Sequence, residues 1–359
     1  MSHHRHTAFR RRDRIMISNR SFVFEPGSEE SFDEMADLYN AVDFADHPDF
    51  AKISGDFFRS SYAVANIIPS RDVLHVRKKG GGIIASATSY MEDPEHCQQR
   101  IVLQVHPNFR GQGLGSMLLD RVLHRSRNAG ARTVKCRVQS YRPESVYFAE
   151  KNGFVLDHSY VKMRLSLKST IPTSQKREDV RIRHLDIDTE LGLWAQLQNA
   201  IFEDTSDYAP VTVEKLKTLV QKPQFDSSLA LIIEEGGKSI GICTGWTFAS
   251  KEDAEDKVLQ IQGFGVLKQH RGNGFGGVLL REMLNRGRDL GYTSAELLVL
   301  NSAWAARHLY SKVGFKERYR HLIYVRNLIG QNASTGNVNH STDTHETSEV
   351  AKHTSYWMG

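Results

Sequence analysis

Two short segments combine arginine and glycine in a pattern that suits an anion. They read Arg110-Gly-Gln-Gly-Leu-Gly115 and Arg271-Gly-Asn-Gly-Phe-Gly276, and each lies between an apolar strand-like run and a run with helical apolar spacing. A glycine-rich turn between a strand and a helix presents free backbone N–H groups at the positive end of the helix dipole. Glycines also let the backbone approach the anion closely. Because the arginine adds a positive charge, we expect each segment to bind a phosphate group.

The two segments belong to a long internal repeat. The offset between them is 161 residues, and no gap is needed when residues 105–155 are aligned with residues 266–316. In that window 15 of 51 positions are identical, including Gly153-Phe154 against Gly314-Phe315. Solenoid repeats are 20–50 residues long, so a period of this length indicates duplication of a whole domain.

The elements expected around the two segments run in the same order in both copies. Each copy begins with a strand and a helix, and three strand-like runs follow. After the glycine segment come a long helix, a strand, a shorter helix and a last strand. This order predicts an α/β fold in which each copy has a central sheet with helices on its faces. The expected domains are residues 20–167 and 179–327, joined by a polar, proline-containing linker at 168–178. We expect the basic arm 1–19 and the polar tail 328–359 to be disordered.

The glycine pattern alone leaves the phosphate ligand open. Residues 272–277 also fit the Gly-x-Gly-x-x-Gly pattern of dinucleotide-binding folds. However, the last of these glycines is Ser116 in the first copy, and each loop follows several strands, whereas a dinucleotide-binding loop usually follows the first strand. A Walker-type loop is excluded because no Gly-Lys-Ser/Thr follows the glycines. A dinucleotide oxidoreductase therefore stays a remote alternative.

Read with their flanks, both segments resemble a motif of the GNAT acetyltransferases. Val105-His-Pro-Asn-Phe-Arg-Gly-Gln-Gly-Leu-Gly and Val266-Leu-Lys-Gln-His-Arg-Gly-Asn-Gly-Phe-Gly look like the loop that holds the pyrophosphate of acetyl-coenzyme A in that family. Asn301 and the helix end Tyr310-Ser-Lys-Val-Gly-Phe match a second landmark. The tandem arrangement is similar to that of mycothiol synthase, although no residue fixes that substrate. The resemblance implies two GNAT-like domains with mixed, mainly antiparallel sheets, acetyl-coenzyme A as the acyl donor and no metal.

The resemblance also assigns donor-binding residues to both copies. They are Val105, Arg110, Gly111, Gln112, Gly113, Leu114 and Gly115 in the first, and Phe264, Gly265, Val266, Arg271, Gly272, Asn273, Gly274, Phe275, Gly276, Asn301 and Tyr310 in the second.

The copies differ where the chemistry would occur. In the family, a tyrosine at the position of Tyr310 commonly protonates the departing thiolate, and a phenol with a pKa of about 10 keeps its proton at neutral pH. The first copy has Ala149 there, and Ser140 in place of Asn301. Glycine inside a strand often marks a bulge, and the strand before the second loop contains Gly263 and Gly265. The first copy has Val102 and Gln104 at these two positions, so we expect the second domain to be catalytic and the first to be degenerate.

The general base is less defined than the general acid. Many relatives carry a glutamate on the strand before the loop, but this chain has Gln260 and Gln262 there. Loops between the first helices often line the acceptor site in this family, and an acidic loop would suit a cationic amine. The candidate bases are therefore Glu203, Asp204 and Asp207 in such a loop, together with Glu296.

Composition excludes several other classes of protein. Residues 1–20 hold six arginines and one aspartate, which account for the whole net charge of +5, so we expect no nucleic-acid-binding face. No run approaches the roughly 20 apolar residues that span a bilayer, and we expect no membrane partner. The arm lacks the pattern of a secretory signal, and three scattered cysteines form no disulfide framework. Both features favour a cytoplasmic protein.

The sequence thus predicts an acetyl-coenzyme A-dependent N-acetyltransferase. Transfer would be direct, from the second domain to a small-molecule amine or a protein N-terminus. The alternative is a regulatory module that binds acyl-coenzyme A and whose transfer activity is vestigial.

Overall fold

The computed structural model describes residues 22–46, 52–168, 177–205, 208, 210–248 and 257–329. Its contacts divide these residues into two compact units, 22–134 with 327–329 and 135–326. The expectations for the basic arm, for most of the linker and for the tail beyond residue 329 lie outside the described residues, as does Asp207. In the described part of the chain, no helix is long and apolar enough to cross a membrane.

The first unit pairs its strands in the order β1-β2-β3-β4, with antiparallel neighbours throughout. Aromatic residues of α1 and α2 pack together above this sheet, where the rings of Phe32 and Tyr62 meet edge to face at 5.5 Å. The elements are β1 (Phe22–Pro26), α1 (Phe32–Asp46), α2 (Gly55–Val64), α3 (Pro69–Asp72), β2 (Val73–Lys78), β3 (Ile83–Asp93), β4 (Gln98–Val105) and α4 (Leu114–Asn128), with 3-10 turns at Glu29–Ser31 and Pro107–Phe109.

The second unit holds the strands in the order β5-β12-β6-β11-β10-β9-β8-β7. Strands β10 and β11 are parallel. Strand β6 pairs antiparallel with both β11 and β12, and β7, β8, β9 and β10 pair antiparallel in sequence order. The strands are β5 (Thr133–Gln139, which begins in the first unit), β6 (Val155–Ser166), β7 (Val180–His184), β8 (Phe225–Glu235), β9 (Lys238–Phe248), β10 (Val258–Val266), β11 (Ser294–Leu300) and β12 (Lys316–Asn327). The helices are α5 (Pro143–Lys151), α6 (Leu191–Phe202), α7 (Val213–Val220), α8 (Phe275–Asp289) and α9 (Trp304–Val313), with a 3-10 turn at Lys268–His270.

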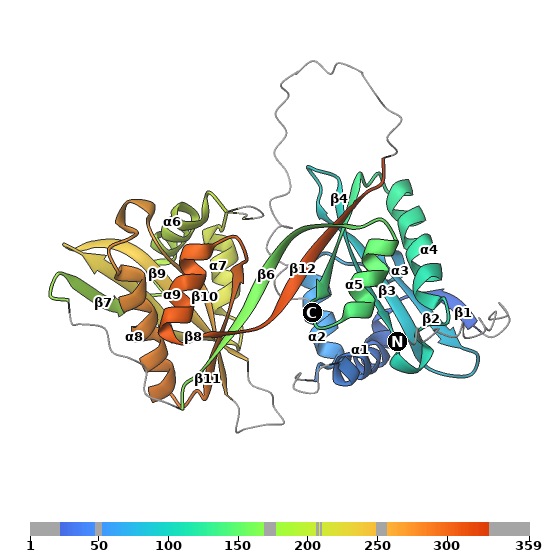
Figure 1. Cartoon of the computed structure of the whole chain (residues 1–359), viewed down its shortest axis with the longest axis horizontal. Helices are drawn as coiled ribbons and strands as arrows, with labels where there is room; N and C mark the ends of the chain where they lie inside the picture. The colour runs from blue at the N-terminus through green and yellow to red at the C-terminus, as the bar shows by residue number, and fades with distance from the viewer. Residues whose placement is uncertain are drawn as a thin grey trace, which may run out of the picture. The chain divides into compact units, whose positions relative to one another are not determined.

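The last strands of the two sequence repeats have exchanged neighbours. Strand β6 ends the first repeat, yet it pairs with β11 of the second repeat from Ser166↔Ser294 to Tyr160↔Leu300. Its other neighbour is β12, the last strand of the second repeat, which in turn lies beside β5 of the first. Figure 1 shows β6 and β12 as two long adjacent strands. Each repeat therefore contributes its final strand to the part of the sheet formed by the other.

The sheet of the second unit is buried on both faces, as the alternation along β8 shows. Leu229, Leu231 and Ile233 belong to the core beneath α8 and α9, while Ala230 and Ile232 belong to the core beneath α6 and α7. The fold is the expected mixed α/β sheet flanked by helices.

Candidate functional site

The two glycine loops have nearly the same backbone. The arginine at the start of each loop is extended, with φ −68° and ψ 157° at Arg110 and φ −69° and ψ 156° at Arg271. The residue before each helix is a left-handed glycine, with φ 88° at Gly113 and φ 83° at Gly274. A residue with a side chain costs about 1–2 kcal/mol in this conformation, which explains the glycines.

Both helices that follow the loops begin without a side-chain cap. Among the described residues, no side chain bonds to the N-terminus of α4 or α8 from its N-cap position. The first N–H groups of a helix have no partner within the helix, so each loop leaves such donors for a ligand. This geometry suits the phosphate group predicted from the sequence.

The loop arginines have different partners. In both loops, Nε donates to the carbonyl that ends the preceding strand, Val105 at 3.3 Å and Val266 at 3.0 Å. The Arg110 guanidinium also forms a two-pronged ion pair with Asp46, at 2.9 and 3.1 Å. Arg271 instead donates to the Ile201 carbonyl at 2.7 Å, which ties the loop to the end of α6. Thus a carboxylate neutralises the first arginine, whereas the second binds neutral carbonyls.

Strand β10 bulges and leaves its parallel neighbour before it reaches the second loop. Its pairing with β11 covers Val258 to Ile261, and its register against β9 shifts between Gln262 and Gly265. At the bulge, Gly263 has φ +54°, and Thr244 donates from its hydroxyl to the Gln262 carbonyl at 3.0 Å. The backbone groups of β10 beyond Ile261 that face β11 therefore lie outside that ladder and are open to a ligand.

Helix α6 packs directly on the bulged strand. A Cβ atom at Gly265 would lie 2.3 Å from Ile201 Cγ2, and one at Gly263 would lie 3.2 Å from Gln198 Oε1. Glycine at these positions is what allows the close approach. In the first repeat, β4 pairs with β3 in unbroken register from Gln99 to Val105, through the positions equivalent to both glycines. The expected difference between the two strands is therefore present in the structure.

Tyr310 lies at the end of α9 beside the bulged strand. The residue is 7% exposed, and its ring centre lies 5.9 Å from that of Phe264. Burial raises the pKa of the Tyr310 hydroxyl above its ordinary value, so the group keeps its proton at neutral pH. In the first repeat Ala149 is buried at this position, and the nearby Tyr147 is 64% exposed.

Asn301 has a structural environment of its own. Its backbone N–H donates to the Ser159 carbonyl of β6 at 2.8 Å, and its side-chain Oδ1 accepts from Arg307 at 2.9 Å. Asn301 therefore joins the end of β11 to both β6 and α9. The sequence does not predict this contact with β6, because it depends on the strand exchange.

The candidate bases are held in different ways. Lys268 lies 2.9 Å from Asp204 and holds the pKa of that carboxyl below its usual range. Glu203 is exposed next to it, at the end of α6. Glu296 is mostly buried, and its Oε2 lies 2.7 Å from Lys162 Nζ and accepts from Gln260 Nε2 at 2.6 Å.

Glu296 also lies 3.5 Å from Arg164 and is thus flanked by two cations from β6. Its carboxylate oxygens are therefore engaged by both cations and by the Gln260 amide, whereas Glu203 is exposed. Sequence reasoning missed Lys162 and Arg164, because they reach Glu296 only through the exchanged strand.

A group of possible metal ligands lies on the hairpin between β3 and β4. Among the described residues, ligand atoms of Asp93, Glu95 and His96 lie within 4.8 Å of one another. Glu95 and His96 are exposed, and His96 Nδ1 is hydrogen-bonded to Asp93 Oδ2 at 2.8 Å. An exposed acidic group whose members bond to one another supports no metal assignment.

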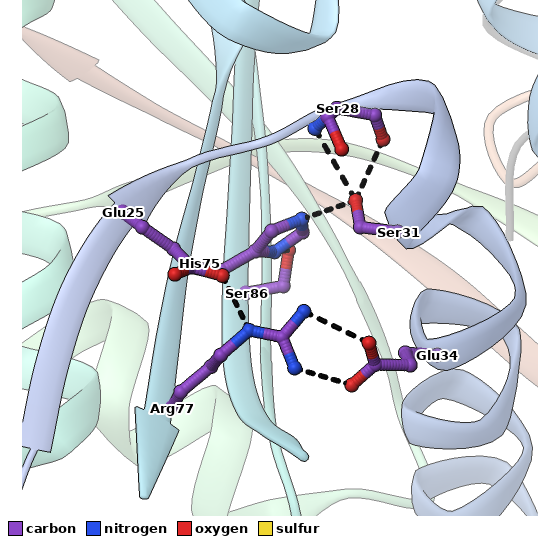
Figure 2. Close-up of polar contacts among 7 residues, drawn as sticks. All are labelled: Glu25, Ser28, Ser31, Glu34, His75, Arg77 and Ser86. Carbon is purple, nitrogen blue, oxygen red and sulfur yellow. Dashed lines mark hydrogen bonds and ion pairs between the residues drawn. The ribbon is translucent and has the colours of Figure 1, made fainter. Parts of the chain in front are cut away.

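A buried Ser–His–Ser chain in the first unit has the residue types of nucleophilic catalysis (Figure 2). Ser31 Oγ lies 3.0 Å from His75 Nε2, and His75 Nδ1 lies 3.2 Å from Ser86 Oγ. The single Ser31 hydroxyl proton is donated to the Ser28 carbonyl at 2.6 Å, so His75 donates from Nε2 and accepts at Nδ1. His75 therefore takes no proton from Ser31 and does not activate it. Because Ser31 is also buried, the three hydrogen-bonded side chains serve the packing of the first unit.

Comparison with known proteins agrees with this geometry. The model of the acetyltransferase (GNAT) family matches residues 32–154 and again residues 194–315, more than half of the chain. The mycothiol acetyltransferase of Thermobispora bispora is 29% identical over 227 residues, which are 63% of this chain and 75% of that protein. The mycothiol acetyltransferase of Salinispora arenicola is 26% identical over 255 residues, 70% of this chain and 81% of that protein.

Solved structures show the same fold. A GCN5-related N-acetyltransferase from Sphaerobacter thermophilus superposes with a TM-score of 0.70 at 21% identity, covering 87% of this chain and 96% of that one. A tandem GNAT protein from the clavulanic acid biosynthesis pathway superposes with a TM-score of 0.65 at 14% identity, covering 87% of this chain and all of the other. The chain belongs to the GNAT family in its tandem layout, and it is an N-acetyltransferase.

Proposed function

We propose that the second repeat transfers an acetyl group from acetyl-coenzyme A directly to an amine, either a small molecule or a protein N-terminus. The observation that supports this most strongly is the meeting of three features in one place: an uncapped glycine loop, a bulged strand end and a buried tyrosine. Phe264 joins them, because its ring lies beside Tyr310 and 3.6 Å from where a Cβ atom at Gly276 would be. The catalytic domain would be residues 179–327, completed by β6 of the first repeat.

The residues present fit a donor with a diphosphate and an extended arm. The left-handed Gly274 and the uncapped start of α8 form the diphosphate cradle, and the arm would run along the open edge of β10. When bound, the thioester supplies an activated acyl group. The backbone N–H groups on the open side of β10, that of Val266 among them, would orient its carbonyl and stabilise the developing oxyanion.

Proton transfer needs an acid and a base. Tyr310, buried and neutral, would give its proton to the departing sulfur. Glu203 is the proposed acceptor of the amine proton, because Asp204 is engaged by Lys268 and Glu296 by two cations. An acidic loop at the end of α6 suits an amine that arrives with a positive charge. We further propose a cytoplasmic location, because all three cysteines are free thiols.

The first repeat suits binding without transfer. Its loop keeps the phosphate-binding backbone, but its strand is regular and Ala149 replaces the tyrosine. A chain in which both repeats behaved this way would be a sensor of acyl-coenzyme A, which is the alternative function.

One experiment separates the two functions. Acetyl-coenzyme A is titrated by calorimetry, and thiol release is then followed with simple amines, peptide N-termini and the acceptor of the mycothiol acetyltransferases. Binding together with amine-dependent thiol release supports the enzyme. Binding without release for every acceptor would favour the sensor, and the absence of binding would contradict both.

A further inference from the structure

Arg177, in the segment between the two repeats, lies across the second glycine loop. Its Nη1 donates to the backbone carbonyl of Asn273, inside the loop. Its guanidinium carbon lies 4.4 Å from the centre of the Phe275 ring, at the first position of α8. Asp179 accepts from its Nε at 3.0 Å and from its Nη2, which fixes the orientation of the group. Arg177 is thus held on three sides at the start of the helix.

This placement leaves donors on Arg177 beside the loop opening. The bonds to Asn273 and Asp179 use three of the five guanidinium N–H groups. Gly274 has no side chain, and the space that a Cβ atom would occupy there is left open. Nη1 of Arg177 lies 4.0 Å from that Cβ position. At Gly113 of the first loop, no described atom lies within 4 Å of that position. Among the described residues, a guanidinium therefore lies beside Gly274, whereas none lies within 4 Å of the equivalent position at Gly113.

We propose that Arg177 is a phosphate-binding residue of the donor site, an inference that rests on the proposed function. A guanidinium is suited to this role because it forms directional, charge-assisted hydrogen bonds to phosphate oxygens. Asp179 acts as a positioning residue, since it accepts from Arg177 without lying in the loop. The segment between the repeats thus adds a cation to the phosphate-binding part of the donor site and is more than a spacer.

The test uses the full-length chain and three acetyl donors. They are acetyl-coenzyme A, the same donor without its 3′-phosphate, and S-acetylpantetheine, which has no phosphate. In Arg177→Ala, KM for acetyl-coenzyme A should rise roughly tenfold with kcat nearly unchanged, as expected for the loss of a charge-assisted contact. Turnover of S-acetylpantetheine should stay unchanged. Arg177→Lys, which keeps the charge without the planar fork, should give an intermediate KM.

The matched control is Arg288→Ala, which removes a similarly exposed arginine paired with a neighbouring aspartate at the far end of α8. It should leave KM unchanged for all three donors. If the rise caused by Arg177→Ala persists without the 3′-phosphate, the contact is to the diphosphate; if it disappears, the contact is to the 3′-phosphate. An unchanged KM, or an equal loss with S-acetylpantetheine, would overturn the role of Arg177. Failure of the unmodified chain to bind any phosphorylated donor would instead overturn the proposed function, and this inference with it.

Discussion

At the first glycine loop, Arg110 is paired with the carboxylate of Asp46, while at the second Arg271 binds two backbone carbonyls. The backbone angles of the two loops nevertheless agree closely. The strands that lead into the loops differ more, because β10 bulges at Gly263 and β4 is regular. The comparison teaches that the glycines fix the same turn in both repeats, although the strands before the turns differ. Under the proposed function, the capacity for transfer would depend on the strand before the loop and on the helix that carries Tyr310.

The largest expected effect comes from closing one loop at a time. Gly274→Val places a branched residue at φ +83°, a left-handed conformation that glycine adopts without strain and valine does not. The new side chain would also fill the space proposed for the phosphate. We expect acetyl transfer to fall by at least about a hundredfold, measured as thiol release. The control is Gly113→Val at φ 88°, which should leave transfer intact. The opposite pattern would show that the first repeat is the catalytic one. Thermal melting of both variants checks that the fold is kept.

The two repeats also differ at one buried, titratable position near the start of each sheet. The buried His75 of β2 lies opposite Glu25, and the corresponding pair in the second repeat is Ile232 opposite Arg183. Burial, together with the nearby Arg77, lowers the pKa of His75 to about 4. Below pH 6.5 the unfolded chain therefore binds a proton before the folded chain does, so stability falls as the pH drops from about 6.5 to about 4.

The His75→Ile variant isolates this effect, because it places the residue of the second repeat in the first. Between pH 7.5 and pH 4, the unmodified chain should lose up to about 3 kcal/mol more unfolding free energy than the variant does. Urea unfolding followed by circular dichroism at several pH values measures the difference. Other titrating groups are common to both proteins and cancel. Equal losses in the two proteins would mean that His75 does not resist protonation.

Removing the proposed acid should slow the chemical step. In Tyr310→Phe the ring still packs against Phe264 and Phe315, but no hydroxyl proton is available for the leaving thiolate. We expect kcat to fall by about a hundredfold, with little change in donor affinity. Tyr147→Phe changes an exposed tyrosine on the equivalent helix and should have no effect. Unchanged turnover in Tyr310→Phe would remove that hydroxyl from the mechanism.

The bulge gives a smaller effect. Gly263→Ala puts a side chain at φ +54° and 3.2 Å from Gln198 Oε1, which costs about 1–2 kcal/mol unless the strand straightens. Because straightening would turn the N–H donors away from the acyl group, kcat should fall by about tenfold. Val102→Ala at the equivalent position of β4 should leave kcat unchanged. Equal kinetics for both variants would show that the bulge is not needed for transfer.

The sequence predicted features that follow from local chemistry. The glycine spacing fixes both loops because each required left-handed turn accepts little else, and Gly263 within a strand pointed to the bulge. Helix α2 was not predicted, although Phe58 and Tyr62, four residues apart, give it a buried face.

The strand exchange could not be predicted from the pattern of residues. Strands β6 and β12 present equivalent edges, so alternation alone does not say which one lies beside β11. The contacts of Lys162 and Arg164 with Glu296 depend on that choice. The contact of Arg177 with the second loop could not be predicted for a different reason. Arg177 lies in a polar segment whose composition indicates only a linker.

The smallest expected effect tests whether the ion pair between Arg110 and Asp46 weakens donor binding at the first loop. Asp46→Asn keeps the size of the side chain but removes the charge that neutralises Arg110, which makes the first loop resemble the second. Combined with Gly274→Val, the substitution leaves the first loop as the remaining predicted donor site, so calorimetry with acetyl-coenzyme A reports on that loop. The affinity should rise a few-fold over Gly274→Val alone, and the gain should shrink at high salt because the group is partly exposed. An unchanged affinity would show that the arginine partner does not distinguish the loops, and that the difference between them lies wholly in the strand and the tyrosine.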